Sequence, residues 1–344
     1  MLDRPTLIAL VFGSLGGAAL QALGLPAGWL CGSMFAVMAI ALRGIRVRMP
    51  EPVRNVALLV IGVSMGTAIT PEILGRAAAW PLSLTLLVIS VAATMQFGTF
   101  YLQRRWGWDN ATARLASVPG ALSAVLAIGA DSRGDMVRIS VSQGLRQVLL
   151  VGLVPLLFWI TPEAAGLARP NMMADLPAMA LMLAVGTVAG LLCRRIGLPG
   201  GLLAGAMIGS GALQATGLVI GGLPMPVLIA AYVILGSSIG AKLYGVTRAT
   251  LVAVLRPSLG ATLGAEVIAG AFAATTSALL DLPLLEVWLA FAPGGVEAMT
   301  VLAYLLNLDP GFVSAHHVVR LLLLMLLSPL WTRGLRATIA PSHV

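Results

Sequence analysis

Apolar residues run along this chain in long blocks, separated by short polar or glycine-rich stretches. In the first half the blocks are roughly 17 to 24 residues long, and they cover 5–23, 26–42, 53–70, 80–103, 111–130 and 137–160. About 20 consecutive apolar residues, wound as an α-helix, cross the hydrocarbon layer of a bilayer. The pattern therefore predicts an all-α integral membrane protein.

The composition agrees with this prediction and excludes several other classes. Hydrophobic residues make up 59% of the chain and charged residues only 10%, far less than a soluble domain carries. Two cysteines give no disulfide framework, and the three histidines offer no cluster of metal ligands in the sequence. The scattered arginines form no basic patch for nucleic acid. We therefore expect the lipid bilayer as a partner, and no enzyme activity, cofactor, metal or nucleic acid.

One motif occurs twice, as GLPAGWLCGSM at 24–34 and as GLPGGLLAGAM at 197–207. A near-constant offset over about 140 residues indicates two homologous halves. We predict a first membrane repeat over 1–165 and a second over 174–340. The other landmarks that recur are GVSMG at 62 and GSSIG at 236, VPG at 118 and APG at 292, Asp135 and Asp309, Arg146 and Arg320, and Pro155 and Pro329.

The fifth block of each repeat is interrupted. Pro119 and Gly120 lie in the middle of 111–130, and a Pro-Gly step breaks most helices. Each remaining arm would span only about half of the hydrocarbon layer. We expect a re-entrant hairpin here and another at the equivalent Pro293 and Gly294, which leaves about ten transmembrane helices.

Positive charge predicts the orientation of the repeats, because cytoplasmic loops are enriched in Lys and Arg. If both fifth blocks are re-entrant and the second repeat is inverted, 17 of the 21 Lys and Arg residues lie on the cytoplasmic side. Only Arg76 and Arg169 then lie outside, while Arg146 and Arg320 fall within spans. If every block crossed, the same loop charges would divide 11 to 8. We therefore predict inverted-topology repeats with both termini in the cytoplasm.

Inverted repeats with interrupted helices are the architecture of secondary transporters, whose binding sites lie near the bilayer midplane. The first candidates for such a site are Arg146 and Arg320. Burial of an arginine at this depth costs roughly 2.5 to 3.5 kcal/mol, so both should face a protein-lined interior. Two roles remain open for them: they bind an anionic solute, or they only hold the carbonyl groups of the hairpins.

The hairpin tips are the second set of candidates. The residues after each Pro-Gly step begin a helical arm, and its free N–H groups favour an anion. The alternative is that these small residues merely allow close packing of helices. Together with the arginines, the tips give the predicted substrate-binding set: Pro119, Gly120, Ser123, Arg146, Pro293, Gly294, Gly295, Glu297 and Arg320.

Four ionisable residues of the second repeat have no ionisable counterpart in the first. They are Glu266, Glu297, His316 and His317. Any of them could carry a proton together with a solute. The alternatives are helix capping by Glu297 and a permanently neutral Glu266. Coupling to Na⁺ also stays open, since its ligands leave little mark in a sequence.

The two copies of GLPxGxLxGxM, each followed by a Pro-Gly segment, and the stretch APGGVEAMTVLAYLLNLDPGFVSAHHVVRLLLL resemble the AbrB family over nearly the whole chain. The resemblance implies a duplicated membrane domain in the bacterial inner (plasma) membrane. Members are labelled ammonia monooxygenase or are linked to regulation of gene expression. The oxygenase label fits poorly, because a copper oxygenase needs clustered His or carboxylate ligands.

We expect a transporter-like protein that moves a small, anionic solute through a midplane site between the two repeats. The alternative is a sensor or regulatory protein that binds a ligand in the membrane without moving it, and that influences gene expression. A membrane monooxygenase is the weakest alternative. A homodimer is expected only from the habits of this architecture.

Overall fold

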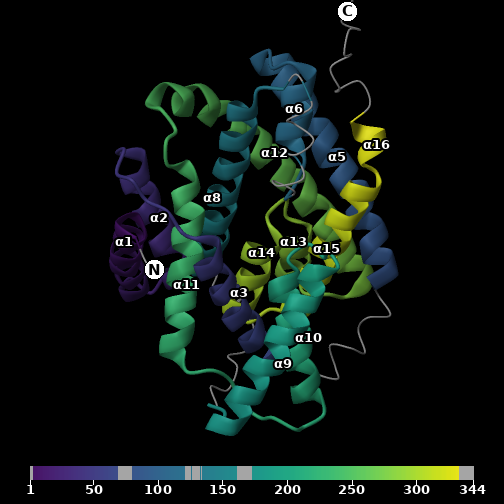
Figure 1. The fold of residues 1–344 in the computed structure, drawn as a ribbon. Helices are drawn as coiled ribbons and strands as arrows, with labels where there is room; N and C mark the ends of the chain where they lie inside the picture. The colour runs from purple at the N-terminus through teal and green to yellow at the C-terminus, as the bar shows by residue number, and fades with distance from the viewer. Residues whose placement is uncertain are drawn as a thin grey trace, which may run out of the picture.

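The structure is a computed structural model that describes residues 3–68, 80–120, 125, 132, 134–160 and 173–332 (Figure 1). Its first part forms α1 (Arg4–Ala22), α2 (Gly28–Leu42), α3 (Glu51–Met65), η1 (Gly66–Ala68), α5 (Trp80–Trp106), α6 (Asn110–Ser117) and α8 (Met136–Ile160). Its second part forms α9 (Leu176–Arg195), α10 (Gly201–Ala215), α11 (Met225–Gly240), η4 (Ala241–Leu243), α12 (Arg248–Leu280), α13 (Leu284–Phe291), α14 (Val296–Leu305), α15 (Pro310–Leu326) and α16 (Ser328–Trp331).

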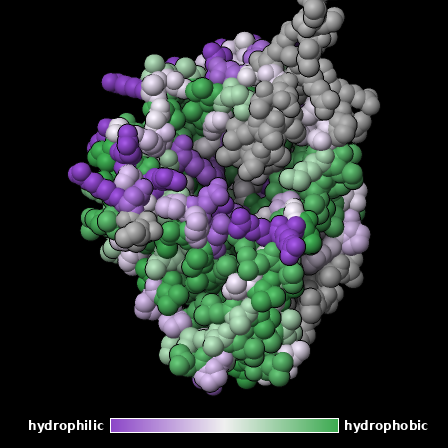
Figure 2. All heavy atoms as spheres, in the orientation of Figure 1, coloured by the Kyte–Doolittle hydropathy of each residue, from purple (hydrophilic) through white to green (hydrophobic). Residues whose placement is uncertain are grey.

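Within the described ranges, six helices are long and apolar enough to cross a membrane, namely α1, α5, α8, α9, α11 with η4, and α12. Large side chains such as Leu176, Val188 and Leu192 of α9 are exposed. Figure 2 shows hydrophobic surface over most of the lower part of one face, where α9 and α10 lie. The all-helical, membrane-type character is therefore confirmed for this part of the chain. The repeats and the number of crossings stay predictions.

Local sequence explains where several helices begin. The side chains of Asp109 and Asp175 accept hydrogen bonds at 2.9 Å from the backbone N–H groups three residues later, which caps α6 and α9. α2 and α10 begin differently, after Ala27 and Gly200, whose φ angles of 56° and 65° are left-handed. Glycine adopts this conformation freely and alanine only with strain. The left-handed turn is the structural counterpart of the duplicated GLPxG motif.

The helices pack in two groups (Figure 1). One group, which we call the panel, consists of α1, α2, α3, α9, α10 and α11, and in it α2 packs on α11 and α3 on α10. The other group, which we call the bundle, consists of α5, α6, α8, α12, α13, α14 and α15, and in it α5 packs on α12. α8 also contacts α2 and α11, so it lies at the seam between the groups. Each group contains helices from both ends of the chain.

Glycines bring the panel helices close together. A Cβ atom at Gly62 of α3 would collide with the carbonyl group of Leu203 in α10. In the same way, a Cβ atom at Gly236 of α11 would collide with the carbonyl group of Leu30 in α2. These helices therefore pack backbone against backbone, as small residues allow in membrane proteins.

Both interruptions predicted from the Pro-Gly steps are present. α6 ends at Ser117 and α13 ends at Phe291, just before each step. The chain then turns, and α14 starts at Val296 after the second step. With 10 residues, α14 is about 15 Å long, half of the hydrocarbon thickness. Most of the corresponding arm after the first step, 121–124 and 126–131, lies outside the described residues.

Candidate functional site

Each interruption leaves backbone carbonyl groups without a helical partner, and an arginine binds them. In the second half, Arg320 of α15 is 2% exposed. Its Nη1 donates to the carbonyl of Ala292 at 2.6 Å, and its Nη2 donates to the carbonyl of Gly294 at 2.5 Å. A buried charge is tolerated only when it is well paired. The carbonyl groups of the break supply that pairing.

Arg146 of α8 does the same at the first interruption. It is 7% exposed, and its Nη2 donates to the carbonyl of Val118 at 2.6 Å. Its Nη1 donates to the carbonyl of Ala116 at 3.3 Å. Both arginines therefore hold a broken helix in place, which is the structural role that the sequence left open.

A second polar residue supports each arginine from one turn earlier in the same helix. Gln143 accepts a hydrogen bond from Arg146 and donates to the carbonyl of Leu115 at 3.1 Å. His317 accepts from Arg320 through Nδ1 at 2.6 Å and donates through Nε2 to the carbonyl of Leu289 at 3.0 Å. An arginine only donates and a carbonyl only accepts, so His317 carries its proton on Nε2 and is neutral in this arrangement.

The two interruptions meet each other. Gly120 has φ 75°, a left-handed conformation that suits glycine. A Cβ atom at this position would lie 2.6 Å from the carbonyl oxygen of Gly294 and 3.0 Å from Nη2 of Arg320. The absence of a side chain at Gly120 therefore lets the first break lie directly against the second.

A cavity of about 320 Å³ opens beside this meeting point, at the seam between panel and bundle. The bundle contributes both breaks and α8, whereas the panel contributes Arg54, Lys242 and the α9–α10 turn. The full lining is Arg54, Gly120, Gln143, Arg146, Gln147, Pro199, Gly200, Lys242, Pro293, Gly294, Gly295, Val296, Glu297, Leu321 and Met325.

The electrostatics of the cavity favour an anion. Arg54, Arg146 and Lys242 face one acid, Glu297. The first residues of α14 also line it, and the free N–H groups at a helix N-terminus attract negative charge. Cationic side chains of this kind form charge-assisted hydrogen bonds with carboxylates and inorganic oxyanions.

Two polar contacts cross the seam at this cavity. Nη2 of Arg54 in the panel lies 4.0 Å from Oε1 of Glu297 in the bundle, and both side chains are about one-third exposed. Nζ of Lys242 in the panel donates to Oε1 of Gln147 in the bundle at 2.5 Å. At this cavity the two groups of helices are thus joined by a partly exposed ion pair and by one hydrogen bond.

The structure brings most of the predicted substrate-binding residues together. Gly120, Arg146, Pro293, Gly294, Gly295 and Glu297 line the cavity. Pro119 is buried next to it, and Ser123 lies outside the described residues. Arg320 binds the carbonyl groups of the break but does not line this cavity.

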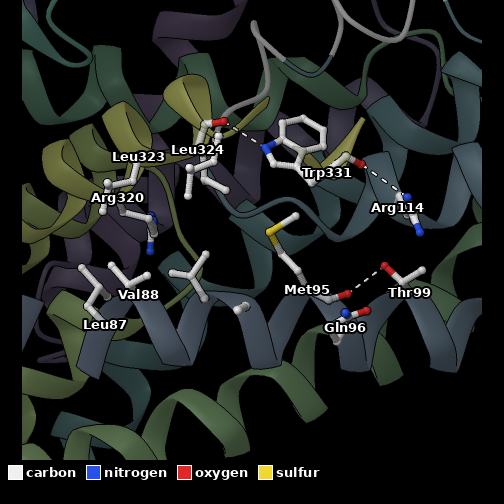
Figure 3. A pocket seen from close by; sticks show the side chains of 13 residues that line it. Leu87, Val88, Met95, Gln96, Thr99, Arg114, Arg320, Leu323, Leu324 and Trp331 are labelled. Atoms are coloured by element: carbon white, nitrogen blue, oxygen red, sulfur yellow. Dashed lines mark hydrogen bonds between the residues drawn. The ribbon is translucent and has the colours of Figure 1, made fainter. Parts of the chain in front are cut away.

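Arg320 instead lines a second cavity of about 360 Å³ between α5, α15 and α16 (Figure 3). The walls there are mostly apolar, including Leu87, Val91 and Leu324. At the right of the view, away from Arg320, Arg114 donates to the carbonyl of Trp331 at 3.5 Å. This space is less suited to a small polar solute than the seam cavity, because its polar groups are few and widely separated.

Sequence reasoning missed several polar residues of the seam cavity, namely Arg54, Gln143, Gln147 and Lys242. Some signals were available. Gln143 lies one turn before Arg146 and Gln147 directly follows it, in an apolar block of the sequence, and Lys242 is the only lysine of the chain. Arg54 lies near the start of its span, where the sequence does not distinguish it from the charge of a cytoplasmic loop. Its position at the cavity is therefore not evident from the sequence.

The remaining proton-carrying candidates lie apart from the cavity. Glu266 of α12 is 6% exposed, and His316 of α15 is fully buried. His316 packs against Phe312, with ring centroids 4.0 Å apart, and its Nδ1 donates to the Phe312 carbonyl at 2.8 Å. In the part of the chain that the structure describes, no three His, Cys, Asp or Glu side chains are grouped as a metal site.

Comparison with known proteins gives one family. A family model described as the transition state regulatory protein AbrB matches residues 6–336. An Escherichia coli (strain K12) protein named as regulator AbrB is 26% identical over 333 residues, which cover 93% of this chain and 92% of that protein. The Bacillus subtilis (strain 168) protein YhjN is 26% identical over 348 residues, which cover 91% of this chain and 88% of YhjN.

Proposed function

The chain belongs to the AbrB family, and from this membership together with the seam cavity we propose that it transports a small anion across the bacterial inner membrane. The observation that carries the proposal is the charge in the cavity. Three cationic side chains and a helix N-terminus converge on a space of about 320 Å³, and one acid opposes them. That volume lies at the lower end of the range for small-molecule binding sites, roughly 300 to 1,000 Å³. No catalytic step is proposed.

Inverted repeats are part of this proposal, and the positions of the helices support them. α3 and α11 begin at 51 and 225, α6 and α13 at 110 and 284, and α8 and α15 at 136 and 310. The packing is paired in the same way, since α1 contacts α2 as α9 contacts α10, and α6 contacts α8 as α13 contacts α15. We infer that the interrupted segments re-enter from opposite sides and that both termini lie in the cytoplasm.

Transport requires the solute site to face each side of the membrane in turn. Transporters of this architecture achieve this by moving one bundle of helices against another around the site. Here the cavity lies between panel and bundle, and the contacts that span it are the Arg54–Glu297 pair and the Lys242–Gln147 hydrogen bond. The ion pair is long, at 4.0 Å, and its two side chains are about one-third exposed, so its rupture costs little. The seam is therefore the place where we expect the movement.

Thermal unfolding of the detergent-purified chain tests the proposal directly. The ligands are the sodium salts of chloride, nitrate, sulfate, inorganic phosphate, acetate, lactate and succinate. A ligand that binds the folded state at 100 times its Kd adds about 2.7 kcal/mol of stability, which raises the melting temperature. We expect one class of these anions to stabilise the protein.

Arg54→Gln and Arg46→Gln are the matched variants for this experiment. Arg54 lines the cavity and holds no break, whereas Arg46 is exposed in the loop before α3. Loss of one charged hydrogen bond, worth about 1.5 to 3 kcal/mol, weakens anion binding roughly 10- to 100-fold in Arg54→Gln. Arg46→Gln should bind as the parent does. If both variants bind the anion equally well, the anion does not bind in the seam cavity.

A membrane sensor that binds the same anion without moving it is the second candidate. The names of the family model and of the Escherichia coli relative favour this reading, because both refer to regulation. Uptake of the stabilising anion into liposomes that contain the purified chain separates the two. Uptake above that of protein-free liposomes supports transport, and stabilisation without uptake supports the sensor.

A further inference from the structure

Glu266 is a buried carboxyl group that the fold does not satisfy. It lies inside α12 and is 6% exposed, and neither carboxylate oxygen has a hydrogen-bond partner among the described residues. The indole N–H of Trp288 interacts with it, but not in the geometry of a hydrogen bond. Burial of an ionised carboxylate without donors is costly, so this setting by itself favours the protonated, neutral group.

The charges that act on Glu266 are the two break-holding arginines. Arg320 of α15 and Arg146 of α8 both interact with it electrostatically. α5, which packs on α12, carries no ionisable residue between Trp80 and Phe100. α13 carries Glu286, which accepts a hydrogen bond from the backbone N–H of Asp309 at 3.2 Å. Glu266 is therefore the acid on which both buried arginines act.

The other ionisable candidates are already engaged. His317 donates one hydrogen bond and accepts another, so a second proton would break its contact with Arg320. His316 lies between aromatic rings, with Nε2 2.8 Å from Oγ of Ser83. Glu297 is partly exposed and faces Arg54. Glu266 alone among the four combines deep burial with unpartnered oxygens.

Arg146 connects Glu266 to the anion cavity. It lines that cavity and also a small pocket of about 20 Å³, whose walls include Thr94, Ser142, Thr262 and Ala265. Thr262 and Ala265 precede Glu266 by four residues and by one residue on α12. A space of this size with hydroxyl groups around it can hold one water molecule. Arg146 therefore touches both the anion cavity and a small polar pocket beside Glu266, so a charge bound at Arg146 acts on Glu266 as well.

We propose that Glu266 takes up a proton when an anion occupies the seam cavity, so that anion and proton move together. The proposal rests on the anion site of the preceding section. Before binding, burial favours the neutral carboxyl group, and the two guanidinium charges oppose this by favouring the ionised carboxylate. A bound anion offsets the charge of Arg146, and the carboxylate then gains a proton. By reciprocity, protonation of Glu266 tightens anion binding, so affinity rises as the pH falls.

Proton uptake on anion binding tests this inference. The full-length chain is kept in detergent, in weakly buffered solution with a pH-indicator dye. To it is added the anion that gave the largest melting shift among the sodium salts tested above. We expect uptake of up to one proton per bound anion in the parent chain. In Glu266→Gln, a neutral carboxamide replaces the carboxyl group, so uptake should be lost. Its affinity at high pH should match that of the parent at low pH.

Glu51→Gln is the matched control, because Glu51 is exposed at the start of α3 and does not line the cavity. It should take up protons as the parent does. If Glu266→Gln still melts cooperatively, binds the anion and takes up the same number of protons, the inference is wrong while the anion site stands. If none of the tested anions stabilises the parent chain, the proposal of an anion site is wrong, and the proposed coupling is wrong with it.

Discussion

Gln143 and His317 occupy the same place beside the two break-holding arginines. Each accepts a hydrogen bond from the arginine. His317 donates to the carbonyl of Leu289, and Gln143 donates to the carbonyls of Leu115 and Val118. A glutamine therefore satisfies the geometry as well as a histidine does. This equivalence indicates that the imidazole of His317 serves as a neutral spacer and that its ability to titrate is not used.

His317→Gln should preserve the fold, since it places at the second break the residue type that already works at the first. His317→Leu should lose about 1 to 3 kcal/mol of unfolding free energy, because the carbonyl of Leu289 and part of Arg320 would stay buried without a partner. Denaturant titration in detergent micelles measures both values. A large loss in His317→Gln with none in His317→Leu would contradict the hydrogen-bond assignment.

Individual residues were foreseeable to the extent that their chemistry is unusual for a membrane. Arg146 and Arg320 stand out in any apolar block, and the structure gives both of them buried partners. Arg54 and Lys242 did not stand out, because a charge near the end of a span looks like a loop charge. Their approach to the cavity depends on how panel and bundle pack, and a single sequence contains no direct record of that packing.

At the level of helices, the glycine contacts of the panel should control stability. Gly62→Ala would place a methyl group against the backbone of α10, where no flexible side chain can move aside. Overpacking of this kind costs about 1 to 3 kcal/mol. Gly270→Ala is the matched control inside α12, because its Cβ would meet only Trp288 atoms at 3.8 Å.

Gly270→Ala should be neutral or stabilising by up to about 1 kcal/mol, the gain in helix propensity. The unfolding free energies of the two variants are compared in the same detergent. If Gly62→Ala is as stable as Gly270→Ala, the panel helices are not packed as closely as described.

Helix positions followed from hydropathy with good accuracy. The predicted blocks 5–23 and 80–103 correspond to α1 (Arg4–Ala22) and α5 (Trp80–Trp106), and both Pro-Gly steps interrupt a helix. The length of α12, 33 residues, was not anticipated. Hydropathy reports how much of a helix fits into lipid, whereas α12 continues to its polar N-cap at Thr247, well beyond the apolar part.

For the whole molecule, the proposed inversion predicts that two equivalent loops lie on opposite sides of the membrane. The loops after α2 and α10 begin with the same left-handed turn, at Gly44 and Gly217, with φ 81° and 71°. Ile45 and Leu218 follow these glycines and are 39% and 71% exposed. If the repeats are inverted, two equivalent loops of similar shape lie on opposite sides of the membrane.

Single Ile45→Cys and Leu218→Cys variants, made in a chain with Cys31→Ser and Cys193→Ser, test this arrangement in intact cells. An impermeant thiol reagent should label Leu218→Cys from the periplasm and should label Ile45→Cys only after the membrane is permeabilised. Labelling of both positions from the same side would reject the inverted repeats.

The arrangement of the whole molecule was the least predictable level. Charge and hydropathy indicate how often and in which direction the chain crosses, but not which helices associate. The grouping of α2 with α11 and of α5 with α12 depends on side-chain shape, such as the glycines that face Leu30 and Leu203. Those contacts join residues far apart in the chain, and no local pattern contains them.

The hydrogen bonds between each arginine and its break cannot form until the ribosome has synthesised the arginine. The carbonyls of Val118 and Ala292 each precede their arginine by 28 residues. At about 5 to 20 residues per second, a ribosome needs roughly 1 to 6 s to make that stretch. Throughout this interval the nascent break has no guanidinium to hold it at the insertion machinery. A translational pause before codon 146 or 320 therefore lengthens the time for which the break lacks its arginine.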